Sequence, residues 1–261
     1  MYYVQLLRLR KALTWFGAAI TAVALLIVIT MHLPHAETDL SAAKGTIPLS
    51  VLFLGASLIA ILFATICGTS LNQENEGVEM VWAKPIARER LAFEYMLCDL
   101  AAIVTAFVYG LILILLVFAS LGATSVIVVD GSAPAAAVLG LGVAMMWNGE
   151  LQALTSWQIG RGGLMIGLSW AVFAWLLPMC TLLSTYWNPS AHAFLVAANY
   201  LNPLAYLATG GGGHIQINSS SSAANGNVLI PLGWWARAAI AWSLGIAGWG
   251  AATFAWKRLE V

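Results

Sequence analysis

The hydrophobic positions of this chain fall in long runs that contain no charged residue. A helix needs about 20 apolar residues to cross a bilayer core of about 30 Å, and a charge at its centre costs about 2.5 to 3.5 kcal/mol. Windows without Asp, Glu, Lys or Arg cover residues 12–36, 45–73, 100–129, 131–149, 162–236 and 238–256. Trimmed by hydropathy and turn residues, they predict six transmembrane helices near 13–33, 47–68, 99–121, 134–153, 164–186 and 235–255.

The apolar runs are continuous, as residues 22–29 and 111–117 show. A membrane β-barrel would alternate apolar and polar positions, so the pattern predicts an all-α membrane protein with one transmembrane domain over 1–261. Arg8, Arg10 and Lys11 precede the first run, as they would in a signal peptide. The run is longer than the hydrophobic region of such a peptide and no small-residue cleavage site follows, so we expect it to be retained as a span.

Composition agrees with the pattern. Of 261 residues, 61% are hydrophobic and 8% charged, with a net charge of zero. A soluble domain has about 25% charged residues, so a soluble globule is excluded and nucleic-acid binding is disfavoured. The three cysteines, Cys67, Cys98 and Cys180, lie far apart in apolar runs, which predicts small buried hydrophobic residues and no disulfide framework.

The basic residues predict the orientation of the spans. With both termini cytoplasmic, nine of the eleven Lys and Arg residues lie inside and only Lys44 and Arg237 lie outside. This bias follows the positive-inside rule, so we expect a multi-pass protein of the cell (inner) membrane.

Two segments lie between the predicted spans and differ from them in composition. The cytoplasmic loop 70–97 concentrates charged residues, so it faces water or a partner. The outer stretch 188–233 is uncharged: its apolar part is broken by Asn202 and Pro203, and Gly-rich and Ser-rich runs follow. We expect short re-entrant helices in the outer leaflet, then a flexible linker, before the last span.

Several kinds of chemistry are excluded by the sequence. No lysine follows a glycine, so the phosphate-binding loop of an ATPase is absent, and neither a His-Glu-x-x-His zinc motif nor a Gly-x-Ser-Gly serine motif occurs. We therefore expect no catalytic residue and no metal or cofactor in this chain. His32 and His35 are the nearest pair of histidines, and two irregularly spaced ligands do not complete a zinc site.

The loop contains a short amphipathic stretch. Val78, Val81 and Trp82 are spaced i, i+3, i+4, with Glu76 and Glu79 beside them and Pro85 ending the pattern. Helices that lie on a membrane prefer a Lys/Arg-rich polar face, whereas this one is acidic until Lys84. We therefore favour docking to a protein over docking to lipid.

This loop resembles the signature of a known family. Glu74-x-x-Gly77, then Glu79, then Pro85-Ile-Ala-Arg88 is similar to the motif between the second and third spans of type-2 ATP-binding cassette permeases, the membrane subunits of exporters. Gly77 and Glu79 lie one residue closer together than is usual in that motif. The resemblance extends in outline over the whole chain and implies an N-terminal interfacial helix (1–12), a cytoplasmic coupling helix and re-entrant helices before the last span.

The resemblance also implies partners. These are two separate ATPase subunits, which bind ATP and Mg, and a second copy of the permease or a related permease, within membrane lipid. The residues that it assigns to coupling with the ATPase are Glu74, Glu76, Gly77, Val78, Glu79, Val81, Trp82, Pro85 and Arg88.

A substrate path has fewer candidates. Glu150 either lies inside the membrane, with Asn148 and Gln152 as hydrogen-bond partners, or marks the inner end of the fourth span. Trp242 and Trp249 belong to a series of four tryptophans at seven-residue intervals, from Trp235 to Trp256, which lie on one face of the last span. That face either lines a cavity or packs against a neighbour.

We therefore expect a permease that exports a hydrophobic or amphipathic compound, such as a lipid, drug or peptide. One alternative is a haem- or metal-delivery permease of the same architecture, in which replacing His32 or His35 would abolish transport. The other is a membrane enzyme or scaffold, which would have no partner ATPase.

Overall fold

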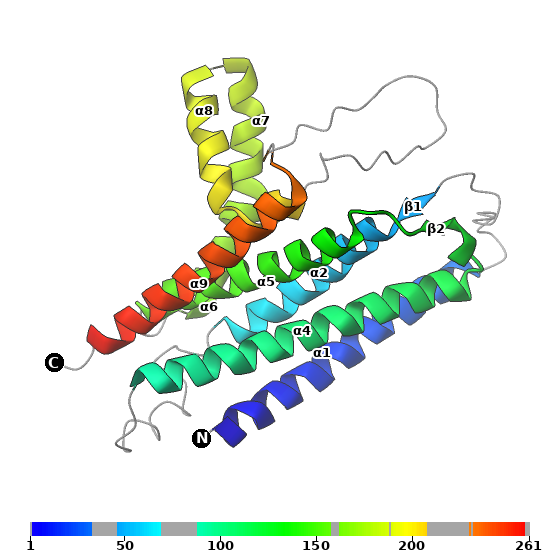
Figure 1. Cartoon of the computed structure of the whole chain (residues 1–261), viewed down its shortest axis with the longest axis horizontal. Coiled ribbons are helices and arrows are strands. Elements are labelled where there is room, and N and C mark those ends of the chain that lie inside the picture. The colour runs from blue at the N-terminus through cyan, green and yellow to red at the C-terminus, as the bar shows by residue number, and fades with distance from the viewer. Residues whose placement is uncertain are drawn as a thin grey trace.

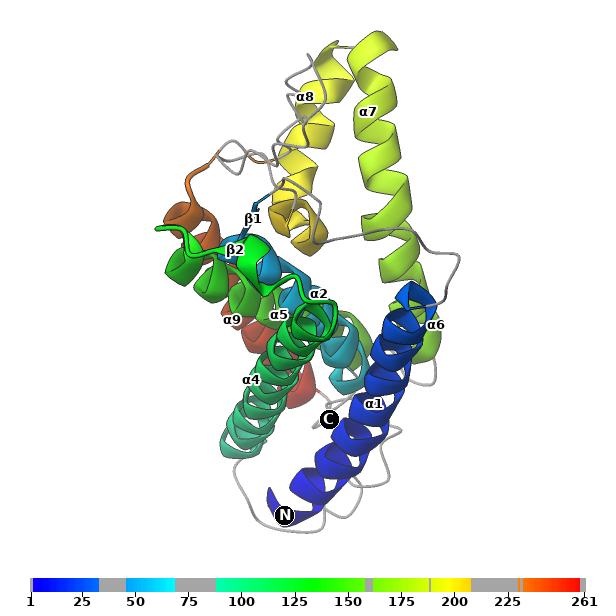
Figure 2. The same ribbon diagram turned by 90° about the vertical axis from the view of Figure 1, so that its right-hand side faces the viewer.

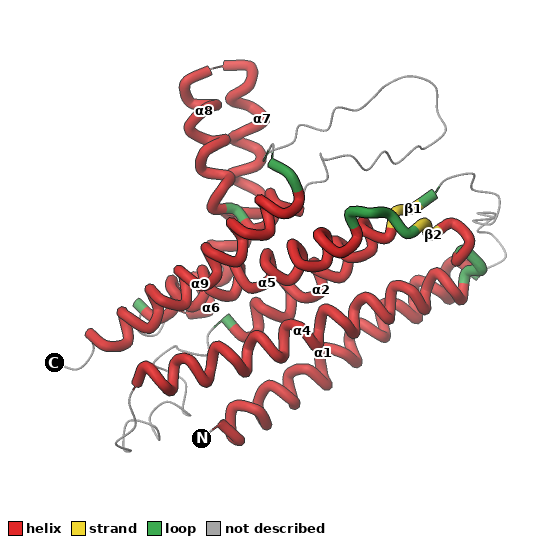
Figure 3. The backbone as a smooth tube through the Cα atoms, in the orientation of Figure 1, coloured by secondary structure: helices red, strands yellow, loops and turns green. Residues whose placement is uncertain are grey.

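The computed structural model describes residues 2–32, 46–68, 88–157, 162–187, 189–207, 230 and 232–258, and most of these are helical (Figure 3). The described α-helices are α1 (Tyr2–Met31), α2 (Leu49–Cys67), α4 (Arg88–Ser120), α5 (Ala133–Ser156), α6 (Gly162–Trp170), α7 (Leu177–Trp187), α8 (Pro189–Ala198) and α9 (Trp234–Arg258). Shorter elements are the strands β1 (Ile47–Pro48) and β2 (Ile127–Val128), the helical turns η2 (Thr124–Val126), η4 (Asn199–Leu201) and η5 (Pro203–Leu207), and the π-helical turn η3 (Ala171–Leu176).

Among the described residues, five helices are long and apolar enough to cross a membrane: Leu9–Met31, Leu49–Cys67, Glu89–Ser120, Gly162–Ser184 and Trp234–Ala255. The chain therefore has the architecture of an all-α, multi-pass membrane protein. α5 is equally long, but Asn148, Glu150 and Gln152 lower the hydropathy of its second half. It is the most buried helix and packs between α2 and α9.

The helices form a row in which α1 contacts α4, α4 contacts α2, α2 contacts α5 and α5 contacts α9 (Figure 1). The helices of the row lie side by side, so the row has two faces formed by helix ends. Both termini lie at the face where α2 and α5 end and α4 begins. We call this the termini end. At the opposite end, α7 and α8 stand side by side and project away from the row (Figure 2).

The N-terminal residues differ from expectation. α1 runs without a break from Tyr2 to Met31, so residues 2–12 are the first turns of the long helix and not a separate interfacial helix. No Gly or Pro interrupts this stretch, and its hydrogen bonds therefore continue into the apolar run. The expected spans otherwise match described helices within a few residues, except that α4 begins earlier, at Arg88.

At the opposite end, β1 and β2 pair in parallel through Ile47 with Ile127 and Pro48 with Val128. Asp130 accepts a hydrogen bond from the Ser50 backbone N–H (3.0 Å), at the start of α2, and another from the Ser132 hydroxyl. Burial raises the pKa of Asp130, but these hydrogen bonds outweigh it and leave the pKa below its usual value. The stabilisation by ionised Asp130 is therefore fully present above the pKa that this carboxyl has in the unfolded chain. It is lost as the pH falls through the lower pKa that the carboxyl has in the folded protein.

Glycines bring the backbones of α5 and α9 into direct contact. A Cβ added at Gly248 would lie 2.5 Å from the Gly149 carbonyl carbon, and one at Gly245 would lie 2.9 Å from the Met145 carbonyl carbon. Small residues allow such close approach between membrane helices, where dispersion and weak hydrogen bonds replace the hydrophobic driving force.

We expect Gly248→Ala to lower the thermal stability of the purified protein by about 1–3 kcal/mol, because the added methyl group forces α9 away from α5. The matched control is Gly250→Ala, two residues along the same helix, where an added Cβ meets nothing within 4 Å. Both variants gain the same helix propensity. Equal melting temperatures for the two would contradict the close crossing.

The fifth hydrophobic run contains a π-helical turn, η3, directly before Leu177 and Pro178. In η3 the Leu177 N–H donates to the Val172 carbonyl, five residues back. The next bond of this series would join residue 178 to the Phe173 carbonyl, but Pro178 has no N–H. Instead, Nδ2 of Asn202 donates to the Phe173 oxygen at 3.0 Å.

Asn202 belongs to a segment that returns beside α7. Asn199 donates from Nδ2 to the Thr181 hydroxyl (2.8 Å), and His192 Nδ1 lies 3.1 Å from the Ser184 hydroxyl. Asn199 and Asn202 are both fully buried. The expected short helices before the last span are therefore α8, η4 and η5, and they are held against α7 by side-chain hydrogen bonds.

We expect Asn202→Leu to cost about 1–3 kcal/mol of stability, because it leaves a buried carbonyl without its donor. Pro178→Leu restores an N–H at position 178, so Asn202→Leu should cost less in that background. Thermal unfolding of the four proteins of this double-mutant cycle measures the difference. An equal cost in both backgrounds would show that Asn202 does not serve the carbonyl that Pro178 leaves open.

Candidate functional site: the polar stripe of α5

One face of α5 carries polar residues in a region that is otherwise apolar. Asn148, Gln152 and Thr155 are spaced i, i+4, i+7, so a helix places them on one side. All three are fully buried. We call these three residues the polar stripe.

The polar stripe binds the C-terminal end of α2. Thr155 Oγ1 donates to the Gly68 carbonyl (3.0 Å), Gln152 Nε2 to the Cys67 carbonyl (2.7 Å) and Asn148 Nδ2 to the Ala64 carbonyl (3.4 Å). The last carbonyls of a helix have no donor within the helix. The Ala64 carbonyl joins them because the Gly68 N–H bonds to the Thr65 oxygen instead. Side chains of α5 therefore cap α2.

The same side chains reach two further helices. Gln152 Nε2 also donates to Oδ2 of Asp99 on α4 (3.2 Å), and Trp249 Nε1 on α9 donates to Oδ1 of Asn148 (2.9 Å). Asp99 is fully buried and Trp249 nearly so. The polar stripe thus connects α2, α4, α5 and α9 through hydrogen bonds in a buried region, where each lost partner is costly.

A second junction lies beside it at Thr65. The Thr65 hydroxyl accepts from Nε1 of Trp147 (2.9 Å) and from Nε1 of Trp170 (3.3 Å), and it donates to the Ile61 carbonyl. The two indole rings meet edge to face, with centroids 4.9 Å apart. This junction adds α6 to the helices that α5 and α2 hold together.

Glu150 behaves differently from the polar stripe. Its atom Oε2 is buried and has no hydrogen-bond partner among the residues that the structure describes. The expected hydrogen bonds from Asn148 and Gln152 therefore do not reach this atom. Tyr206 of η5 lies within electrostatic range of Glu150, but its hydroxyl donates to the Tyr200 carbonyl at 2.8 Å.

The two candidate tryptophans of α9 pack against α5. Trp242 Nε1 donates to the Val138 carbonyl at 3.1 Å, and the indole lies against Gly142, where an added Cβ would be 2.7 Å from its ring. Trp249 joins the polar stripe, whereas Trp235 is 63% exposed. The series at seven-residue intervals is therefore a packing face at its centre, which is the second of the two interpretations above.

The residues expected to contact an ATPase do not belong to the polar stripe or to its neighbours described above. Glu74, Glu76, Gly77, Val78, Glu79, Val81, Trp82 and Pro85 lie outside the described residues. Arg88 is the first residue of α4. The described flanks of the loop are the end of α2, which α5 caps, and the start of α4, where Arg90 pairs with Glu94 at 3.2 Å.

The histidines do not assemble a metal site in the described part of the chain. No group of three His, Cys, Asp or Glu side chains there could hold an ion. His32 Nδ1 contacts the Val28 carbonyl within its own helix at 2.8 Å, and His35 lies outside the described residues.

Sequence patterns identified Asn148, Glu150 and Trp249 but missed Thr65, Asp99 and Thr155. Thr155 continues the spacing that begins at Asn148, so the stripe itself was visible. Thr65 and Asp99 had no such signal, because a threonine inside an apolar run and an acid at its edge are both common in spans that have no site.

Comparison of the chain with protein-family models, with curated proteins and with solved structures finds no match. What the polar stripe and its surroundings offer, among the described residues, is a buried hydrogen-bonded connection between helices and one carboxyl group apart from it.

We expect Glu150→Gln to raise the melting temperature of the purified protein at neutral pH, because an uncharged amide costs less to bury than a carboxylate. Glu94→Gln is the control: this exposed ion pair with Arg90 contributes about 0–1 kcal/mol. A lower melting temperature for Glu150→Gln would show that a group bound to the carboxylate stabilises the fold.

Proposed function

We propose that this chain is the permease subunit of an ATP-binding cassette exporter, and that it moves a hydrophobic or amphipathic compound out of the cytoplasm or the inner leaflet. The energy comes from two ATPase subunits that dock on the loop between α2 and α4. A second copy of the chain, or a related permease, completes the transporter.

The observation that carries this proposal is where the two described flanks of that loop lie. The end of α2 and the start of α4 both lie at the termini end of the row (Figure 1), and the carbonyl of Gly68, directly after α2, accepts a hydrogen bond from Thr155 of α5. A force applied to the loop acts first on the end of α2. The polar stripe then passes it to α4, α5 and α9, because a buried hydrogen-bonded connection resists separation.

We further propose that α5 is a sixth membrane crossing, with both termini in the cytoplasm. Five crossings would place the two termini on opposite sides of the bilayer, whereas they lie at the same end of the row (Figure 1). α5 runs beside α2 and α9, from Ala133, just after Asp130 at the opposite end, to Thr155 at the termini end. Its polar residues face protein, which is where a membrane helix carries them.

The chemistry of the interior supports an apolar cargo. The described spans carry little charge away from their ends, and Arg237 is nearly buried and donates to the Ile230 (2.7 Å) and Leu232 (2.8 Å) carbonyls. A path through such an interior selects by shape and apolar area. Among the described residues, Glu150 has a buried carboxylate oxygen without a hydrogen-bond partner, so we propose it as a contact for a passing compound.

We expect Trp82→Asp to abolish co-purification of the partner ATPase, because a charged side chain replaces the apolar centre of the docking helix. Trp157→Asp is the matched control. Trp157 is an exposed tryptophan (59%) directly after α5. Affinity purification of the tagged permease from its native membrane, followed by mass spectrometry, measures the bound ATPase.

If wild type and Trp82→Asp retain the same amount of ATPase, the loop is not the docking site. If wild type retains no nucleotide-hydrolysing protein at all, the proposal fails as a whole.

A further inference from the structure

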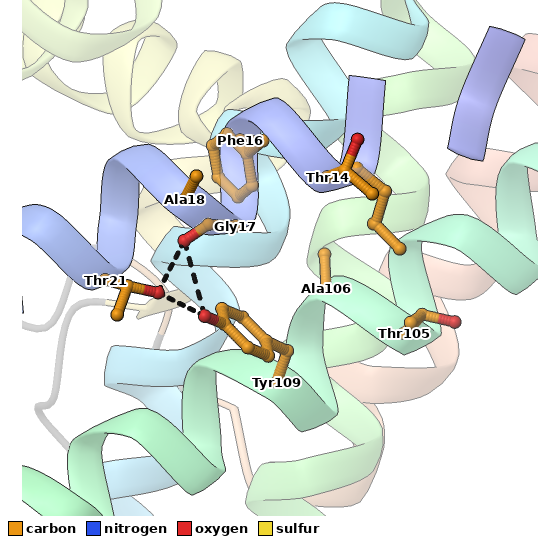
Figure 4. Close-up of a pocket in the computed structure, with 9 residues that line it drawn as sticks. Thr14, Phe16, Gly17, Ala18, Thr21, Thr105, Ala106 and Tyr109 are labelled. Atoms are coloured by element: carbon orange, nitrogen blue, oxygen red, sulfur yellow. Dashed lines mark hydrogen bonds between the residues drawn. The ribbon is translucent and has the colours of Figure 1, made fainter. Parts of the chain in front are cut away.

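A groove of about 320 Å³ lies on the outside of the row, between α1 and α4 (Figure 4). Phe16, Gly17 and Ala106 border it, and Ala106 is buried. Its open side is formed by the exposed residues Thr14, Ala18, Thr105 and Tyr109. The groove therefore faces the surroundings of the protein and not its interior.

The hydroxyl groups in the groove are already engaged. Thr14 donates to the Lys11 carbonyl (2.8 Å), Thr105 to the Ala101 carbonyl (2.8 Å) and Thr21 to the Gly17 carbonyl (2.7 Å). The Tyr109 hydroxyl contacts both Thr21 and the Gly17 carbonyl. With its donors used in this way, the groove offers an apolar surface, which suits a hydrocarbon chain.

Two cations lie at the end of the groove nearest the N-terminus. Arg10 and Lys11 are exposed and stand about one turn before Thr14 on the same helix. The apolar stretch of α1 begins at Leu9, so the two cations stand at its N-terminal end, and long basic side chains at the end of a span extend toward the lipid headgroups.

No carboxylate of α4 competes for these cations at that level. Gly17 faces Tyr109, and α1 and α4 run side by side, so the α4 residues level with Arg10 and Lys11 are 101–103, which are uncharged. The nearest acids of α4 are committed elsewhere. Asp99 is buried against Gln152, and Glu94 pairs with Arg90.

We propose that this groove binds one anionic phospholipid of the bilayer. An acyl chain lies between α1 and α4, against Gly17 and Ala106, and the phosphate headgroup contacts Arg10 and Lys11. The membrane itself supplies this ligand, and basic residues beside a gap between membrane helices are suited to anionic headgroups. The site is independent of the cargo and of any ATPase.

The test uses the purified full-length chain in phosphatidylcholine nanodiscs. The discs contain a trace of either phosphatidylglycerol or phosphatidylcholine with a photoreactive diazirine in the acyl chain, and labelled peptides are identified by mass spectrometry after irradiation. We expect the phosphatidylglycerol probe to label residues 13–21 and 105–109 roughly tenfold more than the phosphatidylcholine probe, as two nearby cations imply. Elsewhere on the lipid-facing helices the two probes should label equally.

Matched variants separate the acyl chain from the headgroup. Ala18→Trp fills the groove and should abolish the preferential labelling, whereas Ala19→Trp, at the next exposed position outside the groove, should preserve it. Replacing Arg10 and Lys11 together by Gln should make the two probes equal. The melting temperature of each variant verifies that it is folded.

Equal labelling by both probes in the wild type overturns the proposal, as does undiminished labelling of a folded Ala18→Trp variant. Cross-links from α1 to a second copy of the chain, in place of lipid, would show that the groove belongs to an interface between subunits and would also overturn it.

Discussion

The structure depends on hydrogen bonds from α5 to the end of α2. The carbonyls at the end of α2 are buried among the helices, where water does not reach them, and each buried polar group left unpaired costs a few kcal/mol. Thr155, Gln152 and Asn148 supply those bonds from a neighbouring helix. Gln152 also hydrogen-bonds Asp99 on α4, and Asn148 hydrogen-bonds Trp249 on α9. The hydrogen bonds that the end of α2 needs therefore also fix the positions of α4, α5 and α9.

The same physical constraint governs the other places where regular backbone is interrupted. Asn202 serves the carbonyl that Pro178 leaves open, and Arg237 serves the carbonyls just before α9. In each case a side chain from another part of the chain replaces the missing backbone donor. This explains how the described segment 189–207 packs against α7: Asn199 and Asn202 are buried because they complete hydrogen bonds there.

The inner and outer surfaces of the row therefore differ in how they are packed. The inner surface around α5 is closely packed, by glycine contacts with α9 and by the polar stripe, and such packing is what the proposed transmission of movement between helices requires. The outer surface between α1 and α4 is loosely filled and its polar groups are used internally, which is what the proposed lipid site requires. Glu150 belongs to neither arrangement, because its buried Oε2 has no hydrogen-bond partner among the described residues.

Much of the fold followed from the sequence, because charge-free runs longer than a bilayer is thick have few alternatives to being helices. The runs located the apolar helices within a few residues, and Asn202-Pro203 predicted the short, broken helices that follow α7. The tertiary structure alone decided the polar stripe's partners. Thr65, Asp99 and the carbonyls of α2 are distant from Asn148 along the chain, and no periodicity within one helix specifies which neighbour it faces. It also separated Glu150 from Asn148 and Gln152, because residues two apart on a helix point to different sides.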